Sequence, residues 1–162
     1  MVEMHAGTRA NVDAIDRAIV DVLSEDARIS MRELAGRVGV SRAAAYSRVD
    51  RLRRSGIIRR FTVEVDHAAL GRPLAAFVNL RVRQAAWRDV RQVLMDIPAV
   101  EHVALVSGET DIVLVVRCAD ASALRDLVLD TLHAMPEVRA TSTWFVLDEV
   151  AAPGHVPAGP LS

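Results

Sequence analysis

The sequence predicts an α+β protein that combines an N-terminal winged helix-turn-helix with a C-terminal ferredoxin-like βαββαβ domain. Two short helix patterns meet at a glycine within the first 60 residues, which is the spacing of a helix-turn-helix. From residue 74 onward, short apolar strand patterns alternate with helix patterns. The two parts also differ in charge, because residues 1–60 hold 12 arginines and 8 acids whereas residues 61–162 hold 8 arginines and 13 acids.

Residues 12–24 are predicted to form the first helix. Their apolar residues recur three or four positions apart, which places them on one helix face. Asn11 or Asp13 is suited to cap this helix, and acids in its first turn favour its positive end. The inward-facing apolar residues are Ile15, Ile19, Val22 and Leu23.

The second helix is predicted over residues 30–38. Ser30 and Glu33 have the spacing of a capping box, in which each side chain accepts a bond from the other residue's amide. Gly39 ends this helix, and Ser41 is suited to cap the next one.

The third helix is predicted from Ser41 to Ser55, with Gly56 as its C-terminal stop. In a helix-turn-helix this is the element that enters the DNA major groove, with its N-terminal end towards the bases. Apolar residues of the second and third helices complete a three-helix core. These are Leu34, Ala35, Val38, Ala45, Val49 and Leu52.

Alternating apolar and polar residues over 57–65 predict a strand, which we interpret as the wing. Residues 66–73 contain Gly71 and Pro73 and are predicted to form a hinge. The predicted DNA-binding domain is therefore residues 1–60, followed by a strand and hinge linker over 61–73.

The body domain is predicted over residues 74–150. Its strands are expected at 75–83, 100–107, 112–118 and 138–149, and its helices at 87–97 and 122–135. Each helix ends in a proline-containing turn before a strand, and the two turns are 38 residues apart. This internal repeat predicts two βαβ halves and therefore the split βαββαβ fold. The tail, residues 151–162, is rich in proline, glycine and alanine and is predicted to be disordered.

Right-handed crossovers place both helices on one face of the predicted sheet, so the other face is left uncovered. An uncovered apolar sheet face favours pairing with a second copy of the chain. We therefore expect at least a homodimer.

The third helix carries most of the residues that we expect at DNA, and Arg59 follows its end. Arg42 and Tyr46 are predicted to contact bases or lie close to them, although Arg42 is equally suited to a phosphate. Arg48, Arg51, Arg53, Arg54 and Arg59 are predicted to contact phosphates, with pairing to an acid inside the head as the alternative for Arg48. The remaining predicted contacts are Ser41, Ala43 and Ser47.

The loop between the two middle strands is a candidate effector site. Gly108 allows a ligand carboxylate to approach main-chain amides closely, and Asp111 is suited to hold an ammonium group. A plain hairpin turn is the alternative. The full predicted set is Ser107, Gly108, Glu109, Thr110, Asp111, Thr141 and Thr143, and the valines and isoleucines nearby favour an aliphatic amino acid.

No catalytic or metal site is predicted. The five histidines are scattered without metal-ligand spacing, and no nucleophile elbow, phosphate loop or dinucleotide motif is present. Cys118 lies in an apolar strand and is expected in the core. No apolar run reaches the roughly 18 residues of a membrane span, and the N-terminus has no signal region, so we expect a cytoplasmic protein without a cofactor.

Taken together, the motifs resemble the Lrp/AsnC family of leucine-responsive and asparagine regulators over about residues 12–150. In the head, the similar segments are Asp13 to Ile19, Glu33 to Ala35, and Arg48 to Ile58. In the body, Gly108 and Asp111 between two strands are similar to the family's loop.

The resemblance implies a transcription regulator that binds double-stranded DNA as a homodimer or a higher, octamer-like oligomer. It also implies that a small amino acid or related metabolite binds between body domains and changes the assembly. The alanine-rich third helix favours one alternative, a non-specific architectural protein of the nucleoid type. A metabolic enzyme or its regulatory subunit is the other alternative.

Overall fold

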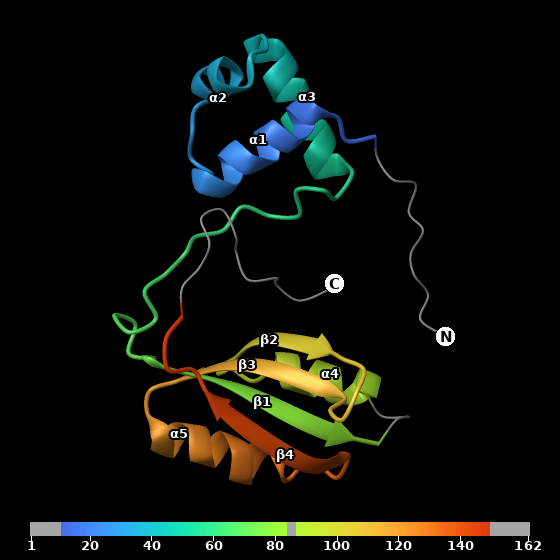
Figure 1. Cartoon of the computed structure of the whole chain (residues 1–162), viewed down its shortest axis with the longest axis vertical. Helices are drawn as coiled ribbons and strands as arrows, with labels where there is room; N and C mark the ends of the chain where they lie inside the picture. Colours follow the sequence, from blue (N-terminus) through green and yellow to red (C-terminus); the bar gives the residue numbers. More distant parts are fainter. Residues whose placement is uncertain (1–10, 84–86, 150–162) are drawn as a thin grey trace. The chain divides into compact units, whose positions relative to one another are not determined.

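The computed structural model describes residues 11–83 and 87–149. The chain divides into two compact units, and the boundary along the sequence falls between Glu64 and Val65. The first unit, the head, contains α1 (Ala14–Glu25), α2 (Met31–Val38) and α3 (Arg42–Arg54) (Figure 1). The predicted helix-turn-helix is confirmed, because α2 and α3 are joined by a short turn in which Gly39 has φ +70°.

Side-chain caps begin the three head helices. The Ser30 hydroxyl accepts a bond from the Glu33 amide at 3.2 Å, which is half of the predicted capping box. Glu33 does not complete the box, because its carboxylate pairs with Arg37 at 3.3 Å. The reciprocal box forms instead at the start of α1, between Asp13 and Asp16.

The head core is small and fully apolar apart from one carboxylate. Ile19, Leu34 and Leu52, one from each helix, have no exposed surface. Burying such a side chain contributes about 1.5–3 kcal/mol each, so these three contacts fix how α3 crosses the other helices. Leu23, Ile29 and Val49 extend the same cluster.

The predicted wing strand at residues 57–65 is wrong. The segment leaves α3 after an Ile58 amide bond to the Leu52 carbonyl, and the structure gives it no strand. Alternation of apolar and polar residues gives a segment the two faces of a strand. A strand also needs a neighbouring strand to bond its backbone amides, and within the described residues no strand pairs with residues 57–65. Phe61 lies instead over the Arg53 guanidinium at 6.0 Å, which ties the segment to α3.

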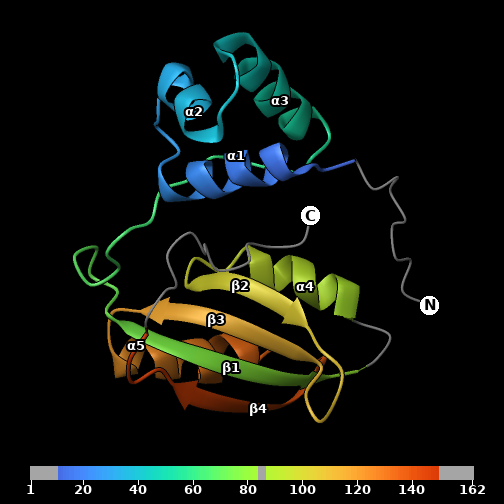
Figure 2. The same cartoon turned by 45° about the horizontal axis from the view of Figure 1, so that its top comes forward.

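The second unit, the body, is a four-stranded antiparallel sheet with helices on one face (Figure 2). Its elements are β1 (Leu74–Val82), α4 (Trp87–Met95), β2 (Val100–Leu105), β3 (Ile112–Cys118), α5 (Ala121–Asp126), the π-helix η1 (Leu127–Leu132) and β4 (Val138–Phe145). The strand order β2-β3-β1-β4 confirms the predicted βαββαβ topology. The predicted helix 122–135 is interrupted, because its second half has π-helical bonding.

Alternate residues of β1 separate the two sheet faces. Ala76, Val78 and Leu80 are fully buried in the body core, together with Leu94 of α4 and Leu132 of η1. On the opposite face Phe77 is 39% exposed, and its β4 neighbour Trp144 is 62% exposed. The uncovered apolar face that the sequence predicted is therefore present. Among the described helices, none has the length and apolar character that a membrane crossing requires.

Candidate DNA-binding surface and effector pocket

The outer face of α3 carries the residues predicted to approach bases. Ser41 caps the helix through a 3.2 Å bond from the Ala44 amide, so Arg42 stands in the first turn. Arg42, Tyr46 and Ser47 are exposed, whereas Ala45, Val49 and Leu52 face the core. Ala43 is also exposed on this side. The predicted base-facing residues therefore share one accessible surface at the N-terminal end of the helix.

Arg48 and Arg51 point towards acids of α1. Arg48 Nη1 lies 2.7 Å from Asp13 Oδ2 and 2.8 Å from Asp16 Oδ1. Arg51 Nη2 lies 2.6 Å from Asp16 Oδ2 and 2.7 Å from its other oxygen. For Arg48 this is the alternative left open by the sequence. For Arg51 it was not anticipated, because the acid is 35 residues away in the chain.

Asp16 is the centre of this ion-pair cluster, and its side chain has no exposed surface. Burial alone would raise its pKa. Hydrogen bonds from Arg51, Arg48 and the Asp13 amide outweigh burial and lower the pKa of Asp16 to about 2. The bonds to Asp13 and Asp16 also raise the pKa of Arg48. The cluster is therefore fully ionised at neutral pH and holds α3 against α1.

The pKa of Asp16 gives an acid-stability prediction. The pKa is about 2 in the folded chain and 3.8 ordinarily, so the carboxylate stabilises the head fully above pH 5. That contribution should be lost as pH falls from about 4 to 2. Thermal unfolding followed by circular dichroism against pH should show this loss in the native chain. In an Asp16→Asn variant, stability should fall less steeply between about pH 4 and pH 2. If the variant loses stability with pH as steeply as the native chain, the low pKa does not belong to Asp16.

Four of the arginines predicted to contact DNA keep their guanidinium groups outside the cluster. Arg42 and Arg59 are exposed and have no ion pair among the described side chains. Arg53 is exposed against Phe61, and Arg54 pairs with Asp50 of its own helix at 2.6 Å. Such an exposed pair contributes about 0.5 kcal/mol or less, so Arg54 is readily recruited to a phosphate.

The loop between β2 and β3 presents free main-chain donors. Gly108 has φ +141°, a conformation that side-chain-bearing residues rarely adopt. Within the described part of the chain, the amides of residues 107–110 donate to no partner. Asp111 anchors the loop to β1, because its Oδ2 accepts from the Val82 amide at 2.8 Å and its amide donates to the Leu80 carbonyl at 3.0 Å.

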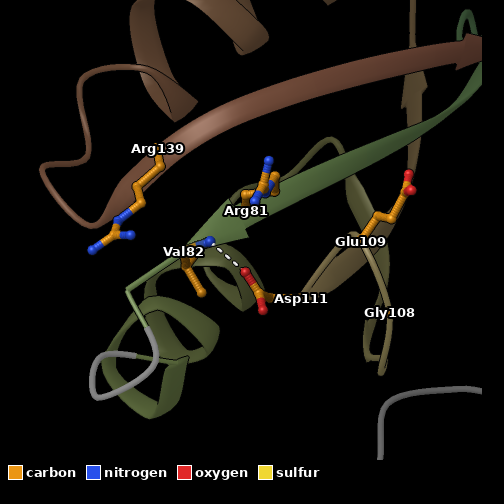
Figure 3. A pocket seen from close by; sticks show the side chains of 6 residues that line it. All are labelled: Arg81, Val82, Gly108, Glu109, Asp111 and Arg139. Atoms are coloured by element: carbon orange, nitrogen blue, oxygen red, sulfur yellow. Dashed lines mark hydrogen bonds between the residues drawn. The ribbon is translucent and has the colours of Figure 1, made fainter.

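A cavity of about 370 Å³ opens beside this loop (Figure 3). Its size lies at the lower end of small-molecule sites. The structure brings three predicted residues together there, Gly108, Glu109 and Asp111. It adds three that the sequence did not suggest, and the described residues that line the cavity are Arg81, Val82, Gly108, Glu109, Asp111 and Arg139.

Thr141 and Thr143 do not line this cavity. They pair with Leu80 and Val78, whose side chains face the helices, and β1 separates β4 from β3. The Thr141 hydroxyl lies 2.7 Å from the His133 ring. From the sequence, both threonines were expected near the loop if strands of the two halves lay side by side. β4 does lie beside β1, but Thr141 and Thr143 share the sheet face of Leu80 and Val78 and not the cavity.

Cys118 is buried at the end of β3, and burial raises the pKa of its thiol. The residue is therefore part of the body core, as predicted.

Known proteins match both units. Residues 12–53 match the model of the AsnC-type helix-turn-helix domain, and residues 75–155 match that of the Lrp/AsnC ligand binding domain. The leucine-responsive regulatory protein of Escherichia coli (strain K12) is 34% identical over 153 residues, or 93% of each chain. The HTH-type transcriptional regulator FL11 of Pyrococcus abyssi is 31% identical over 139 residues, 86% of this chain and 91% of that protein.

Solved structures agree with these matches. The transcriptional regulator NMB0573 of Neisseria meningitidis in complex with L-Met has a TM-score of 0.83 at 29% identity, over 90% of this chain and 96% of that one. AsnC of E. coli has a TM-score of 0.80 at 25% identity, over 88% of this chain and 97% of that one.

Proposed function

Because the chain belongs to the Lrp/AsnC family, whose members are transcriptional regulators and not enzymes, we propose that it binds operator DNA sequence-specifically under the control of a small amino acid. The observation that supports the DNA-binding half of the proposal is the exposed face of α3. Arg42, Tyr46 and Ser47 are exposed there, while Arg48 and Arg51 hold the helix against α1. Such a regulator works on the chromosome, in the cytoplasm of a bacterial or archaeal cell.

In the proposed complex, the N-terminal end of α3 meets base edges in the major groove. The planar Arg42 group is suited to the O6 and N7 atoms of guanine. Arg53, Arg54 and Arg59 lie further along the chain and are suited to phosphates, which position the helix without selecting a sequence. Two copies of α3 would bind half-sites roughly 34 Å apart.

If α3 recognises an operator, replacing Arg42 should reduce affinity for that DNA sequence in particular. A DNA site is first selected from a random library with the native protein. Arg42→Ala should weaken binding to that site by about 1–3 kcal/mol and relax selectivity at one base pair. Arg53→Ala is the matched control, because it should weaken all sequences alike and reduce the salt slope by about one. Equal loss of Arg42→Ala on operator and scrambled DNA would refute base contact.

The same selection experiment distinguishes the second candidate function from operator recognition. The exposed alanine at position 43 reduces the number of base-reading groups on α3, which favours a non-specific architectural protein. If the library yields no enriched site, and affinity for any duplex is equal at each salt concentration, the architectural function replaces the operator-specific one.

We place the effector in the cavity beside Gly108. The free amides of residues 107–110 are suited to an α-carboxylate. An α-ammonium group would lie at Glu109 and at the Asp111 oxygen that Val82 does not use. The effector controls DNA binding only if it binds one assembly of the protein more tightly than another.

The uncovered sheet face is the proposed interface between copies. Phe77 and Trp144 are neighbours across β1 and β4, and both are exposed in the single chain. A second copy seated there would remove this apolar surface from water. The leucine-responsive relative and the L-Met complex support an amino-acid effector for such an assembly, which we propose is a homodimer or larger.

A further inference from the structure

The cavity beside Gly108 holds more positive groups than an aliphatic amino acid can use. This inference rests on the proposed effector role of that cavity and concerns the chemical class of the effector. Arg81 and Arg139 both line the cavity and both are exposed (Figure 3). Among the side chains that the structure describes, neither guanidinium has an ion pair or a hydrogen bond.

A break in strand pairing brings the two arginines to one site. Arg81 of β1 lies opposite Ala140 of β4, whereas the next residue, Val82, lies opposite Val138. Arg139 is therefore the extra residue of a β-bulge, which re-aims its side chain relative to a regular strand. Bulges of this kind are common beside functional sites.

The backbone groups of an amino acid are already accommodated by other parts of the cavity. The loop amides are available to the α-carboxylate, and Glu109 and Asp111 are available to the ammonium group. A leucine or methionine side chain would then lie beside two charged guanidinium groups. Among the described residues that line the cavity, Val82 is the only one with an apolar side chain, and it is only 5% exposed. The described residues of this chain would thus bury little of an aliphatic side chain.

We propose that the effector is an amino acid with a side-chain carboxylate, of the aspartate or glutamate class, and that Arg81 and Arg139 bind this second carboxylate. Guanidinium groups match a carboxylate in charge and in planar geometry. The proposal replaces the aliphatic effector that the sequence favoured. The apolar residues near the loop, such as Val103 and Ile112, are buried in the body core and do not line the cavity.

Calorimetry on the full chain tests the effector class with six probes: L-glutamate, L-aspartate, L-glutamine, L-asparagine, L-leucine and L-methionine. Each acid should bind about tenfold or more tightly than its amide, because a charge-assisted bond is stronger than a neutral one. Arg81→Gln and Arg139→Gln should each remove most of this preference and leave the amide's affinity unchanged. Arg91→Gln, an exposed arginine of α4 outside the cavity, is the matched control. Circular dichroism and light scattering serve to check that each variant folds and assembles.

The outcomes test two claims separately, namely the chemical class of the effector and the role of this cavity as the effector site. If leucine or methionine binds most tightly, and Gly108→Ala weakens that binding, the class is wrong and the effector role of the cavity stands. If glutamate binds but neither arginine variant changes its affinity, the assignment of Arg81 and Arg139 is overturned. If none of the six amino acids binds, the proposed amino-acid effector and its class both fall.

Discussion

Replacing Asp16 by alanine is expected to lower the free energy of unfolding of the head by about 3 kcal/mol. Within the described residues, Asp16 is the one carboxylate that bonds both Arg48 and Arg51, and its removal leaves their charges facing a buried site. The figure is at the lower end for a broken buried pair, because both arginine side chains retain some exposure to water. Urea unfolding followed by far-ultraviolet circular dichroism measures the change.

Asp21→Ala is the matched control for this experiment. Asp21 lies on the same helix, is exposed and has no ion pair within the described residues. Its loss should change the free energy of unfolding by less than about 0.5 kcal/mol. If the two variants unfold at the same urea concentration, the ion-pair cluster does not stabilise the head and our account of α3 positioning is wrong.

Replacing Trp144 by glutamate is expected to separate the assembled protein into monomers of 17.7 kDa. The charge would be placed on the uncovered sheet face beside Phe77. Burying an unpaired carboxylate costs several kcal/mol, so the dimer dissociation constant should rise by more than about a hundredfold. Light scattering measures the mass at several protein concentrations.

A second exposed apolar residue supplies the control for assembly. Leu129 of η1 is 51% exposed and belongs to the helical layer of the body. Leu129→Glu should leave the mass of the assembly unchanged. A native mass that survives Trp144→Glu would show that copies meet elsewhere, and a monomeric native protein would remove the proposed interface altogether.

Local signals predicted the helices well because a helix closes its own hydrogen bonds. Ser30, Gly39 and Ser41 mark ends that the structure reproduces within one or two residues. The prediction of a wing strand failed because the alternation at residues 57–65 does not show whether a partner strand lies beside it. An alternating pattern thus predicts which residues share a face of a strand. Which strands pair with one another is decided by the whole fold.

The candidate sites divide in the same way. The position of Gly108 and Asp111 between two strands was visible in the sequence, since both belong to one loop. Arg139 was not, because a bulge 58 residues beyond Arg81 brings them to one cavity. Arg51 was predicted to contact a DNA phosphate, and the acid that it bonds lies on another helix. The missing information in both cases was which distant segments of the chain come into contact.

Strand β1 contributes to both proposed binding events. Arg81 lines the cavity and Phe77 lies on the uncovered face, four residues apart, roughly 13 Å along an extended chain. Asp111 fastens the end of the same strand through the Val82 amide. Any tilt of β1 that suits the bound effector therefore moves the surface on which a second copy would sit. The coupling between the two binding events must be reciprocal. If the effector binds one assembly more tightly by some factor, then a substitution at the sheet face that shifts the protein to that assembly changes effector affinity by the same factor.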